Sequence, residues 1–331
     1  MHIGLTYDLK QDYLDMGWGP EEAAEFDSIE TIGAIHAAIE RLGHRVSRIG
    51  NCRALMKALV SGERWDMVFN IAEGAHGRGR EAQVPAVLEC FSIPYTMCDP
   101  LTAALTLDKA MAKRVVRDNG LATPDFSVVE KTSDIDRIRL GFPLFVKPLA
   151  EGTGKGISSR SLVMNPVELK AAAMAIIEQH QQPALVETYL PGREVTAGIL
   201  GTGETARAIG VMEIIFKPQI ESAIYSRHAK DNYRDLVEYK LVEEAWLAQE
   251  ARKLAVSAYN ALGCRDVGRV DLKADGRGKW QFLEVNPLPG LHPVDSDLPI
   301  LARLNGIEYS ELIEKIISYT IERTSNKPVC G

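Results

Sequence analysis

Short apolar segments alternate with stretches of helical periodicity along the first hundred residues. Strands are predicted at residues 2–7, 45–49, 66–71 and 93–97, and helices at residues 28–42, 52–60 and 83–91. This alternation favours a parallel sheet covered by helices. Ligands collect at the carboxyl ends of parallel strands, so Tyr7, Asp8 and residues 70–74 are expected at the binding edge of the sheet.

Beyond a linker at Asp99 and Pro100, the pattern predicts further units. Strands are expected at residues 126–129, 141–147, 194–200 and 207–215, and in an apolar run that ends at Glu187. Helices are expected at residues 107–116, 166–180, 242–262 and 309–323. Residues 216–240 show no clear periodicity, and unstructured stretches longer than about 15 residues tend to be functional or disordered. A chain of 331 residues is long enough for two or three domains, which we place at residues 1–100, 101–185 and 186–331.

Residues 269–290 read as two strands joined by a turn rich in glycine. Side chains alternate along a strand, so Arg269 and Asp271 share one face of the first strand. On the second strand, the same rule places Phe282, Glu284 and Asn286 on one face and Leu283 and Val285 on the other. The predicted hairpin brings Asp271 opposite Glu284, where cross-strand side chains lie about 5 Å apart.

Three oxygen-bearing side chains, Asp271, Glu284 and Asn286, would then meet on one side of the hairpin. Two carboxylates so close repel each other unless a cation joins them. Oxygen ligands suit Mg²⁺, which keeps several waters and is often shared with substrate phosphates. A solvated polar face of an antiparallel hairpin is the alternative; Pro287 weakens it, because the chain must leave the sheet there.

A glycine-rich segment at residues 151–157 follows a strand that ends in Lys147. Backbone N–H groups of glycines can approach phosphate closely, and Thr153 and Lys155 add a donor and a charge. The spacing of the glycines matches neither the Walker nor the dinucleotide motif. By itself the segment is equally compatible with a tight hairpin turn.

Charge and cysteine content exclude several classes of function. The net charge is -7, from 38 basic and 45 acidic residues, so the composition does not suggest a basic surface that binds nucleic acid. The 5 cysteines show no paired metal-binding spacing and fit thiols in a reducing compartment, so we expect a cytoplasmic protein. Apolar runs stay short of the ~20 residues that a membrane span needs.

The segment from Arg269 to Gly290 resembles the metal-binding signature of ATP-grasp carboxylate–amine ligases, in particular the D-alanine–D-alanine ligase group. The lysine strand, the glycine loop, the apolar strand at Glu187 and the long aperiodic segment occur in the order of that family. The resemblance implies an α/β (α+β) ATP-grasp fold. Its parts would be an N-terminal Rossmann-like parallel-sheet domain, a small central lid and a C-terminal antiparallel-sheet catalytic domain.

The resemblance also implies roles for individual residues. ATP and two Mg²⁺ ions, with Mn²⁺ as a substitute, are the implied cofactors. The implied nucleotide-binding residues are Lys109, Lys147, Glu151, Thr153, Gly154, Glu187, Leu190 and Glu194, with Glu187 at the adenine amino group and Glu194 at the ribose. The implied metal ligands are Asp271, Glu284 and Asn286. Arg269 would stabilise the tetrahedral intermediate, Lys230 of the long segment would contact phosphate, and Glu25 would hold the substrate ammonium group.

The chain departs from this family after Asn286. D-alanine ligases typically continue through a serine-rich turn that binds the carboxylate of the second alanine, whereas this chain has Asp295, Ser296 and Asp297 there. An aspartate would repel a carboxylate and favour an amine, while Ser296 could still serve if the turn shifts by one residue. The acceptor therefore stays open.

The expected activity is ATP-dependent activation of a carboxylate to an acyl phosphate, followed by attack of an amine, with two amino acids as substrates and a dipeptide as product. Two alternatives share the fold. One is a nucleotide-binding regulatory or carrier protein without ligase turnover, and the other is a kinase of a small carboxylate. Amino acids are the expected small-molecule partners, nucleic acid and membrane are not, and the family suggests a homodimer.

Overall fold

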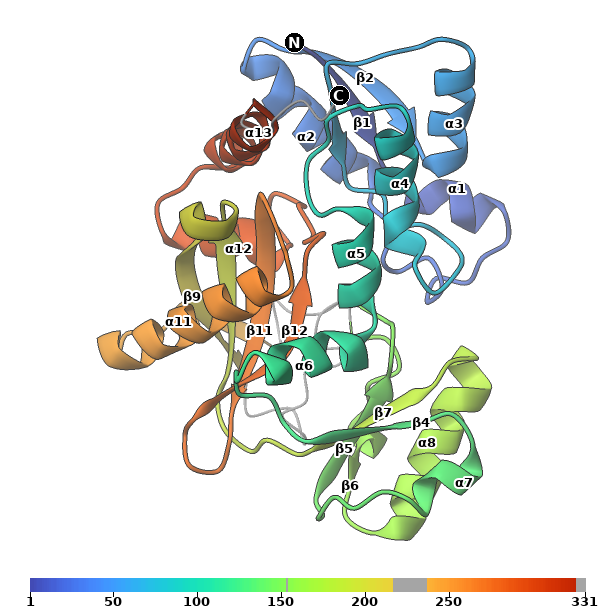
Figure 1. Ribbon diagram of the computed structural model, residues 1–331, viewed down its shortest axis with the longest axis vertical. Coiled ribbons are helices and arrows are strands. Elements are labelled where there is room, and N and C mark those ends of the chain that lie inside the picture. Colours follow the sequence, from blue (N-terminus) through green and yellow to red (C-terminus); the bar gives the residue numbers. More distant parts are fainter. Residues whose placement is uncertain (153, 217–236, 326–331) are drawn as a thin grey trace.

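The computed structural model describes residues 1–152, 154–216 and 237–325. Its strands form three sheets, which follow one another along the long axis of the molecule with the sheet of C-terminal strands in the middle (Figure 1). One sheet is parallel and the other two are antiparallel. This arrangement confirms the predicted mixed α/β fold class.

The N-terminal sheet contains β1 (His2–Thr6), β2 (Arg45–Gly50) and β3 (Met67–Asn70) in the order β2-β1-β3. Both strand pairs are parallel. The surrounding helices are α1 (Lys10–Asp15), α2 (Ile29–Arg41), α3 (Cys52–Val60) and α4 (Gln83–Cys90), with a short 3₁₀ helix at Arg80–Ala82. The sequence offers Asp27 and Ser28 as possible caps of α2, and it is Ser28 whose side chain accepts a hydrogen bond from the Thr31 N–H.

The strand predicted at residues 93–97 is reduced to a single parallel bridge between Val68 and Tyr95 in the described structure. The segment does run beside β3, where the Pro94 carbonyl accepts from the Val68 N–H. Pro94 itself has no N–H to offer to a ladder. Met97 then takes a φ of 72°, which turns the chain away from the sheet.

The central sheet contains β4 (Phe126–Val129), β5 (Leu144–Pro148), β6 (Leu162–Val163) and β7 (Ala184–Thr188) in the order β4-β7-β5-β6. Its pairs are antiparallel. Helix α8 (Pro166–His180) packs on one face, where Ala173 joins Val146 and Val186 in a common core. A short helix α7 (Thr132–Ile135) and a 3₁₀ helix at Ser159–Ser161 complete this part.

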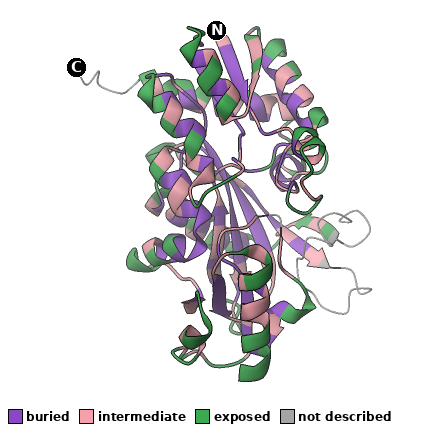
Figure 2. Ribbon diagram, turned by 90° about the vertical axis from the view of Figure 1, so that its right-hand side faces the viewer, coloured by how far each residue is buried: buried purple, intermediate pink, exposed green. Residues whose placement is uncertain are grey.

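The C-terminal sheet has five antiparallel strands in the order β10-β9-β8-β11-β12. These are β8 (Glu194–Leu200), β9 (Arg207–Phe216), β10 (Val237–Leu241), β11 (Val267–Ala274) and β12 (Trp280–Asn286), and a 3₁₀ helix at Gly203–Thr205 joins β8 to β9. Helices α6 (Lys109–Asp118) and α11 (Ala245–Ala261) share a core with β8, β11 and β12. Strands β8 and β11 inside the sheet are buried along most of their length, and the purple strands in Figure 2 mark this buried part.

Helices α12 (Asp297–Leu304) and α13 (Tyr309–Ser325) join the C-terminal sheet to the N-terminal sheet. Gly198 of β8 allows α12 to approach closely, because a Cβ there would lie 2.7 Å from Leu298 Cδ1 and 2.9 Å from Leu301 Cδ2. One core cluster contains Leu298 of α12 and Ile316 of α13 together with Ile3 and Leu5 of β1. The N-terminal sheet is thus fixed to the sheet that carries the hairpin.

The linker predicted at Asp99 and Pro100 is instead the start of a helix, α5 (Pro100–Leu107). The Asp99 side chain accepts from the Thr102 N–H, and proline at the first helical position is a common start signal. The division into residues 1–100, 101–185 and 186–331 stays a prediction, although β7 spans residues 185 and 186 and α6 packs against β12. Within the three described ranges, the helices are all too short or too polar to cross a bilayer.

Candidate active site

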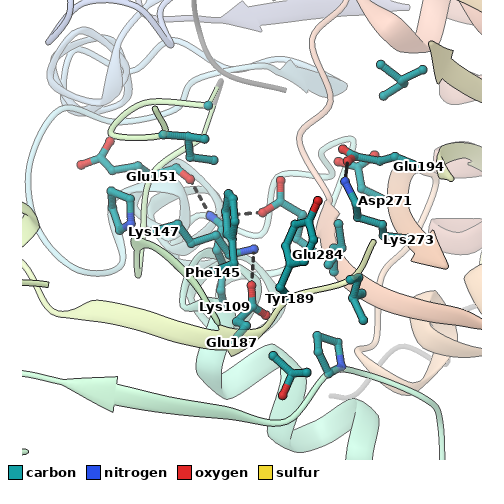
Figure 3. A pocket seen from close by; sticks show the side chains of 18 of the residues that line it. Lys109, Phe145, Lys147, Glu151, Glu187, Tyr189, Glu194, Asp271, Lys273 and Glu284 are labelled. Carbon is teal, nitrogen blue, oxygen red and sulfur yellow. Dashed lines mark hydrogen bonds and ion pairs between the residues drawn. The ribbon is translucent and has the colours of Figure 1, made fainter. Parts of the chain in front are cut away.

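A cleft lies between the central sheet and the C-terminal sheet. Its lining comes from the start of α6, from β5 and the glycine loop, from β7 and the segment after it, and from β8, β9, β11 and β12. The sequence-predicted residues that line it are Lys109, Lys147, Glu151, Gly154, Glu187, Leu190, Glu194, Arg269, Asp271 and Glu284. Figure 3 shows several of these side chains converging on the cleft. The structure therefore brings most of the predicted site together from segments far apart in sequence.

The hairpin has the predicted pairing at its centre, where Asp271 lies opposite Glu284. Beyond this pair a β-bulge shifts the register, so that Leu272 pairs with Phe282 and Leu283 is the extra residue. Phe282 is therefore fully buried in the core with Val285, and Leu283 lines the cleft with Glu284. The predicted faces of Phe282 and Leu283 were wrong, because an extra residue reverses the alternation of a strand.

Asp271 is the best-connected carboxylate of the cleft. Its Oδ1 accepts from Thr196 Oγ1 at 2.6 Å and from Arg269 Nε at 3.1 Å. Its Oδ2 accepts from Arg269 Nη2 at 2.9 Å and from Asn286 Nδ2 at 3.1 Å. Thr196 is a site contact that the sequence analysis missed, because the signal is a strand pairing with β8 that the hairpin pattern alone does not contain.

Two lysines stand near the carboxylates. Lys109 Nζ lies 3.4 Å from Glu284 Oε2 and donates to the carbonyl of Glu151, while Lys147 Nζ lies 2.8 Å from Glu187 Oε2. Burial would raise the pKa of Glu284, but Lys109, Lys147 and Arg269 outweigh it and lower that pKa to about 2. Glu284 is therefore ionised at neutral pH, and the cations around it keep it in that form.

Lys113 is a second partner of Glu187 that the sequence analysis missed. Its Nζ lies 2.6 Å from Glu187 Oε1, and its side chain is fully buried. Burial lowers the pKa of Lys113 to about 8, and the attraction of Glu187 opposes part of that effect. Burial would raise the pKa of Glu187, but Lys113 and Lys147 lower it below its ordinary value. The only local signal for Lys113 is its position one helical turn after Lys109.

One end of the cleft is an apolar slot. Phe145, Tyr189, Leu190 and Leu283 line it, and Figure 3 shows Phe145 and Tyr189 beside the lysines. Two charged residues of the same cleft pair with each other, since Glu194 Oε2 lies 2.6 Å from Lys273 Nζ. Apolar surface with a few polar groups beside it is the usual lining of a small-molecule site.

The glycine loop closes the cleft from the side of the central sheet. Gly154 has a φ of 71° and Gly156 a φ of 74°, which side-chain-bearing residues rarely adopt. Glu151 accepts from Gln182 Nε2 at 2.6 Å and lies 3.1 Å from Lys155 Nζ. Thr153, between these residues, lies outside the described residues. Lys230 does too, as do Lys217 and Arg227, the two residues of the long segment that match the implied phosphate-binding lysine less well.

Glu25 lies on the far side of the glycine loop. Its Oε1 accepts from the Gly152 N–H, and its Oε2 is 2.7 Å from Arg80 Nη2. Burial would raise the pKa of Glu25, but Arg80 and the Gly152 N–H lower it. The structure thus places Glu25 between the N-terminal sheet and the loop, with its carboxylate ionised and already paired.

The residues proposed for magnesium fit a hard cation by donor type. Asp271 and Glu284 are opposite each other, and Asn286 lies on the same strand as Glu284 with its carboxamide against Asp271. The set contains only two carboxylates, and within residues 1–152, 154–216 and 237–325 no group of three or more His, Cys, Asp or Glu is placed to hold a metal. A cation here would need oxygens from another molecule, as Mg²⁺ bound with phosphates does.

Comparison with known proteins gives consistent matches. Residues 115–318 match the family model described as the D-ala D-ala ligase C-terminus. The uncharacterized protein y4sG of Sinorhizobium fredii is 32% identical over 318 residues, which cover 90% of this chain and 89% of that protein. The D-alanine–D-alanine ligase of Bordetella avium is 34% identical over 248 residues, 73% of this chain and 75% of the relative.

The solved structure of D-alanine–D-alanine ligase from Bacillus anthracis complexed with ATP has a TM-score of 0.75 to this chain, at 24% identity, and covers 99% of this chain and 100% of that one. Fold and sequence together place the molecule in the ATP-grasp class of carboxylate–amine ligases. Within that class, the chain belongs to the D-alanine–D-alanine ligase family.

Proposed function

We propose that this chain joins the carboxylate of one amino acid to the amine of a second, with ATP and Mg²⁺, to give a dipeptide, ADP and phosphate. The convergence of Arg269, Asp271 and Glu284 with Lys109 and Lys147 in one cleft carries the proposal. Phosphoryl transfer needs positioning and neutralisation of charge more than a covalent protein intermediate. The described cleft supplies cations from three separate elements for that purpose.

The nucleotide would lie along the cleft from the apolar slot to the hairpin. The slot takes the base, with Glu187 and Glu194 as acceptors for its amino group and the ribose. Lys109 and Lys147 neutralise phosphate oxygens, and the backbone of the glycine loop covers them. Asp271, Glu284 and Asn286 would hold Mg²⁺, which neutralises the charge that develops on the transferred phosphoryl group when it is bound.

The bond-forming half of the reaction depends on Arg269. Attack of an amine on an acyl phosphate creates a negatively charged tetrahedral centre, and a fixed guanidinium stabilises such an oxygen. Arg269 is 8% exposed and lines the cleft beside Asp271. Glu25, ionised beside the glycine loop, is the acceptor proposed for the ammonium group of the first amino acid.

The turn after Asn286 is proposed as the acceptor subsite. Asp297 is buried, and its charge is paired with Arg269 Nη1 at 2.8 Å, which reduces its repulsion of an incoming carboxylate. Ser296 Oγ accepts from the His292 N–H at 3.0 Å and retains its own O–H as a donor. These two observations favour an amino acid acceptor over a simple amine.

The test is ADP release with Mg²⁺ and ATP over a panel of D- and L-amino acids, singly and in pairs, with mass spectrometry of the products. A dipeptide from one or a few pairs is the expected result. A stable phosphorylated carboxylate as the product would instead indicate that the protein is a kinase. Nucleotide binding without turnover on any pair would favour the regulatory or carrier alternative.

A further inference from the structure

Arg269 lies between two carboxylates that come from different elements. On one side, Nε and Nη2 donate to Asp271 of its own strand, at 3.1 and 2.9 Å. On the other side, Nη1 lies 2.8 Å from Asp297 Oδ2. Arg269 is 8% exposed and Asp297 only 2%, so the second contact is shielded from water. The two contacts fix the plane of the guanidinium.

The rest of the fold anchors the Asp297 carboxylate. Asp297 is the first residue of α12, whose Leu298 and Leu301 lie over Gly198 of β8. Its Oδ1 accepts a hydrogen bond of 2.9 Å from the Tyr239 hydroxyl on β10. A buried carboxylate tied to a helix and an edge strand has little freedom to move.

The two carboxylates differ in what else they are proposed to do. Asp271 is also a candidate magnesium ligand, and its oxygens already accept from Thr196 and Asn286. A guanidinium held by Asp271 alone would shift whenever that carboxylate reorients toward a cation. Asp297 is not among the candidate magnesium ligands, so it can hold the guanidinium while Asp271 adjusts.

We propose that Asp297 is a positioning residue, which holds Arg269 in the orientation needed to stabilise the tetrahedral centre during amine attack. The inference rests on the proposed function for the role of Arg269. Asp297 acts in it through the arginine, without contact with the substrate. Its charge is thereby used by Arg269 within the turn.

The kinetic test separates the two halves of the reaction. Asp297→Asn should lower kcat for dipeptide formation by about a hundredfold, which is the typical result of displacing a catalytic group by ~1 Å. Acyl phosphate formation should change little, and so should KM for ATP. Acyl phosphate formation is measured without acceptor, from the movement of ¹⁸O from the β,γ-bridge of ATP to a non-bridging position. Equal losses in both halves would overturn the proposal.

Two further variants distinguish positioning from packing. Asp297→Glu keeps the charge and should recover more of the rate than Asp297→Asn; equal loss in both would point to packing and count against the proposal. In an Arg269→Ala background, Asp297→Asn should cause no further loss of amide formation. The matched control is Glu311→Gln, which removes an exposed charge from the first turn of the neighbouring helix α13 and should leave both halves unchanged.

A measurement without substrate tests the positioning by itself. In protein labelled with ¹⁵N-arginine, a guanidinium held on both sides rotates slowly and gives separate Nη1 and Nη2 resonances, which an Arg269→Lys variant assigns. Asp297→Asn should merge them, and Glu311→Gln should not. Persistence of separate resonances in Asp297→Asn would overturn the inference. If the wild-type protein forms no dipeptide, the proposed function fails, while this spectrum still decides whether Asp297 orders Arg269.

Discussion

Buried carboxylates occur in two regions of the molecule, and their pKa values shift in opposite directions. In the hairpin cleft, burial would raise the pKa of Glu284, yet Lys109 and its neighbours lower it to about 2. Beside the N-terminal sheet, burial raises the pKa of Glu81 to about 7, and Arg80 offsets only part of that effect. Burial acts in the same direction on the pKa of both carboxylates, so the sign and number of the neighbouring charges decide which of them is ionised.

The contrast has a functional meaning. The cleft combines ionised carboxylates with several lysines, which suits a triphosphate and its metal. The N-terminal region has Glu73 and Glu81 near Arg80, which is already paired with Glu25, and Lys109 acts on Glu81 less strongly than Arg80 does. That region has a deficit of positive charge that an ammonium group of a substrate would relieve.

The largest effect is expected from removing one charge in the cleft. Asp271→Asn should lower kcat for ADP release by about a thousandfold or more, because it weakens both the proposed binding of Mg²⁺ and the ion pair with Arg269. Circular dichroism should show a folded protein. Asp275→Asn, in the exposed turn of the same hairpin, is the matched control and should retain turnover. Wild-type turnover in Asp271→Asn would contradict the assignment of the cleft.

The next effect concerns the buried lysines that keep Glu187 ionised. Lys113→Met should reduce the free energy of unfolding by roughly 3 kcal/mol, because it leaves a buried carboxylate with fewer partners. Urea denaturation measures this loss in the free energy of unfolding. Adding Glu187→Gln should recover part of the loss, since the unbalanced charge is then gone. A single variant as stable as the wild type would mean that Lys147 alone balances Glu187.

The sequence predicted some of these local features and missed others. The pairing of Asp271 with Glu284 followed from local alternation and a turn, because both are properties of adjacent residues. The bulge at Leu283 did not, since Phe282, Leu283 and Val285 are all apolar and the sequence does not show where the alternation reverses. Helix α5 was missed although Asp99 and Pro100 carry a start signal, because that dipeptide is also typical of linkers.

Contacts between distant segments were beyond local patterns. Lys113 and Glu187 are 74 residues apart and meet only when α6 packs beside the central sheet. The pairing of Arg269 with Asp297 depends on where α12 lies on the C-terminal sheet. The resemblance supplied Glu187 and Arg269 as site residues, but their partners come from packing that the sequence does not state.

A smaller effect tests the link between the two regions, which is Glu25. Glu25→Gln should raise KM for the first amino acid roughly 10- to 100-fold, as expected for loss of one charge-assisted hydrogen bond, with less change in KM for ATP. Steady-state kinetics with each substrate varied measures the split. Glu21→Gln, exposed in the same loop, is the control. A rise in KM for ATP alone would place Glu25 with the glycine loop instead of the substrate.

The smallest effect is on stability and comes from Glu81. Its folded pKa of about 7 lies above the ordinary value of 4.5, so protonation favours the folded state. That contribution is fully present below pH 4.5 and is lost as pH rises through about 7. Glu81→Gln removes this dependence of stability on pH. Between pH 5 and pH 8, its free energy of unfolding should therefore rise by roughly 1 to 2 kcal/mol relative to that of the wild type.

Urea denaturation at pH 5 and pH 8 measures this gain, with the exposed Glu204→Gln as the control for loss of one charge. An equal difference between wild type and Glu81→Gln at both pH values would mean that Glu81 is ionised throughout. The N-terminal region would then hold its carboxylates ionised as the hairpin cleft does, and the contrast between the two regions would disappear.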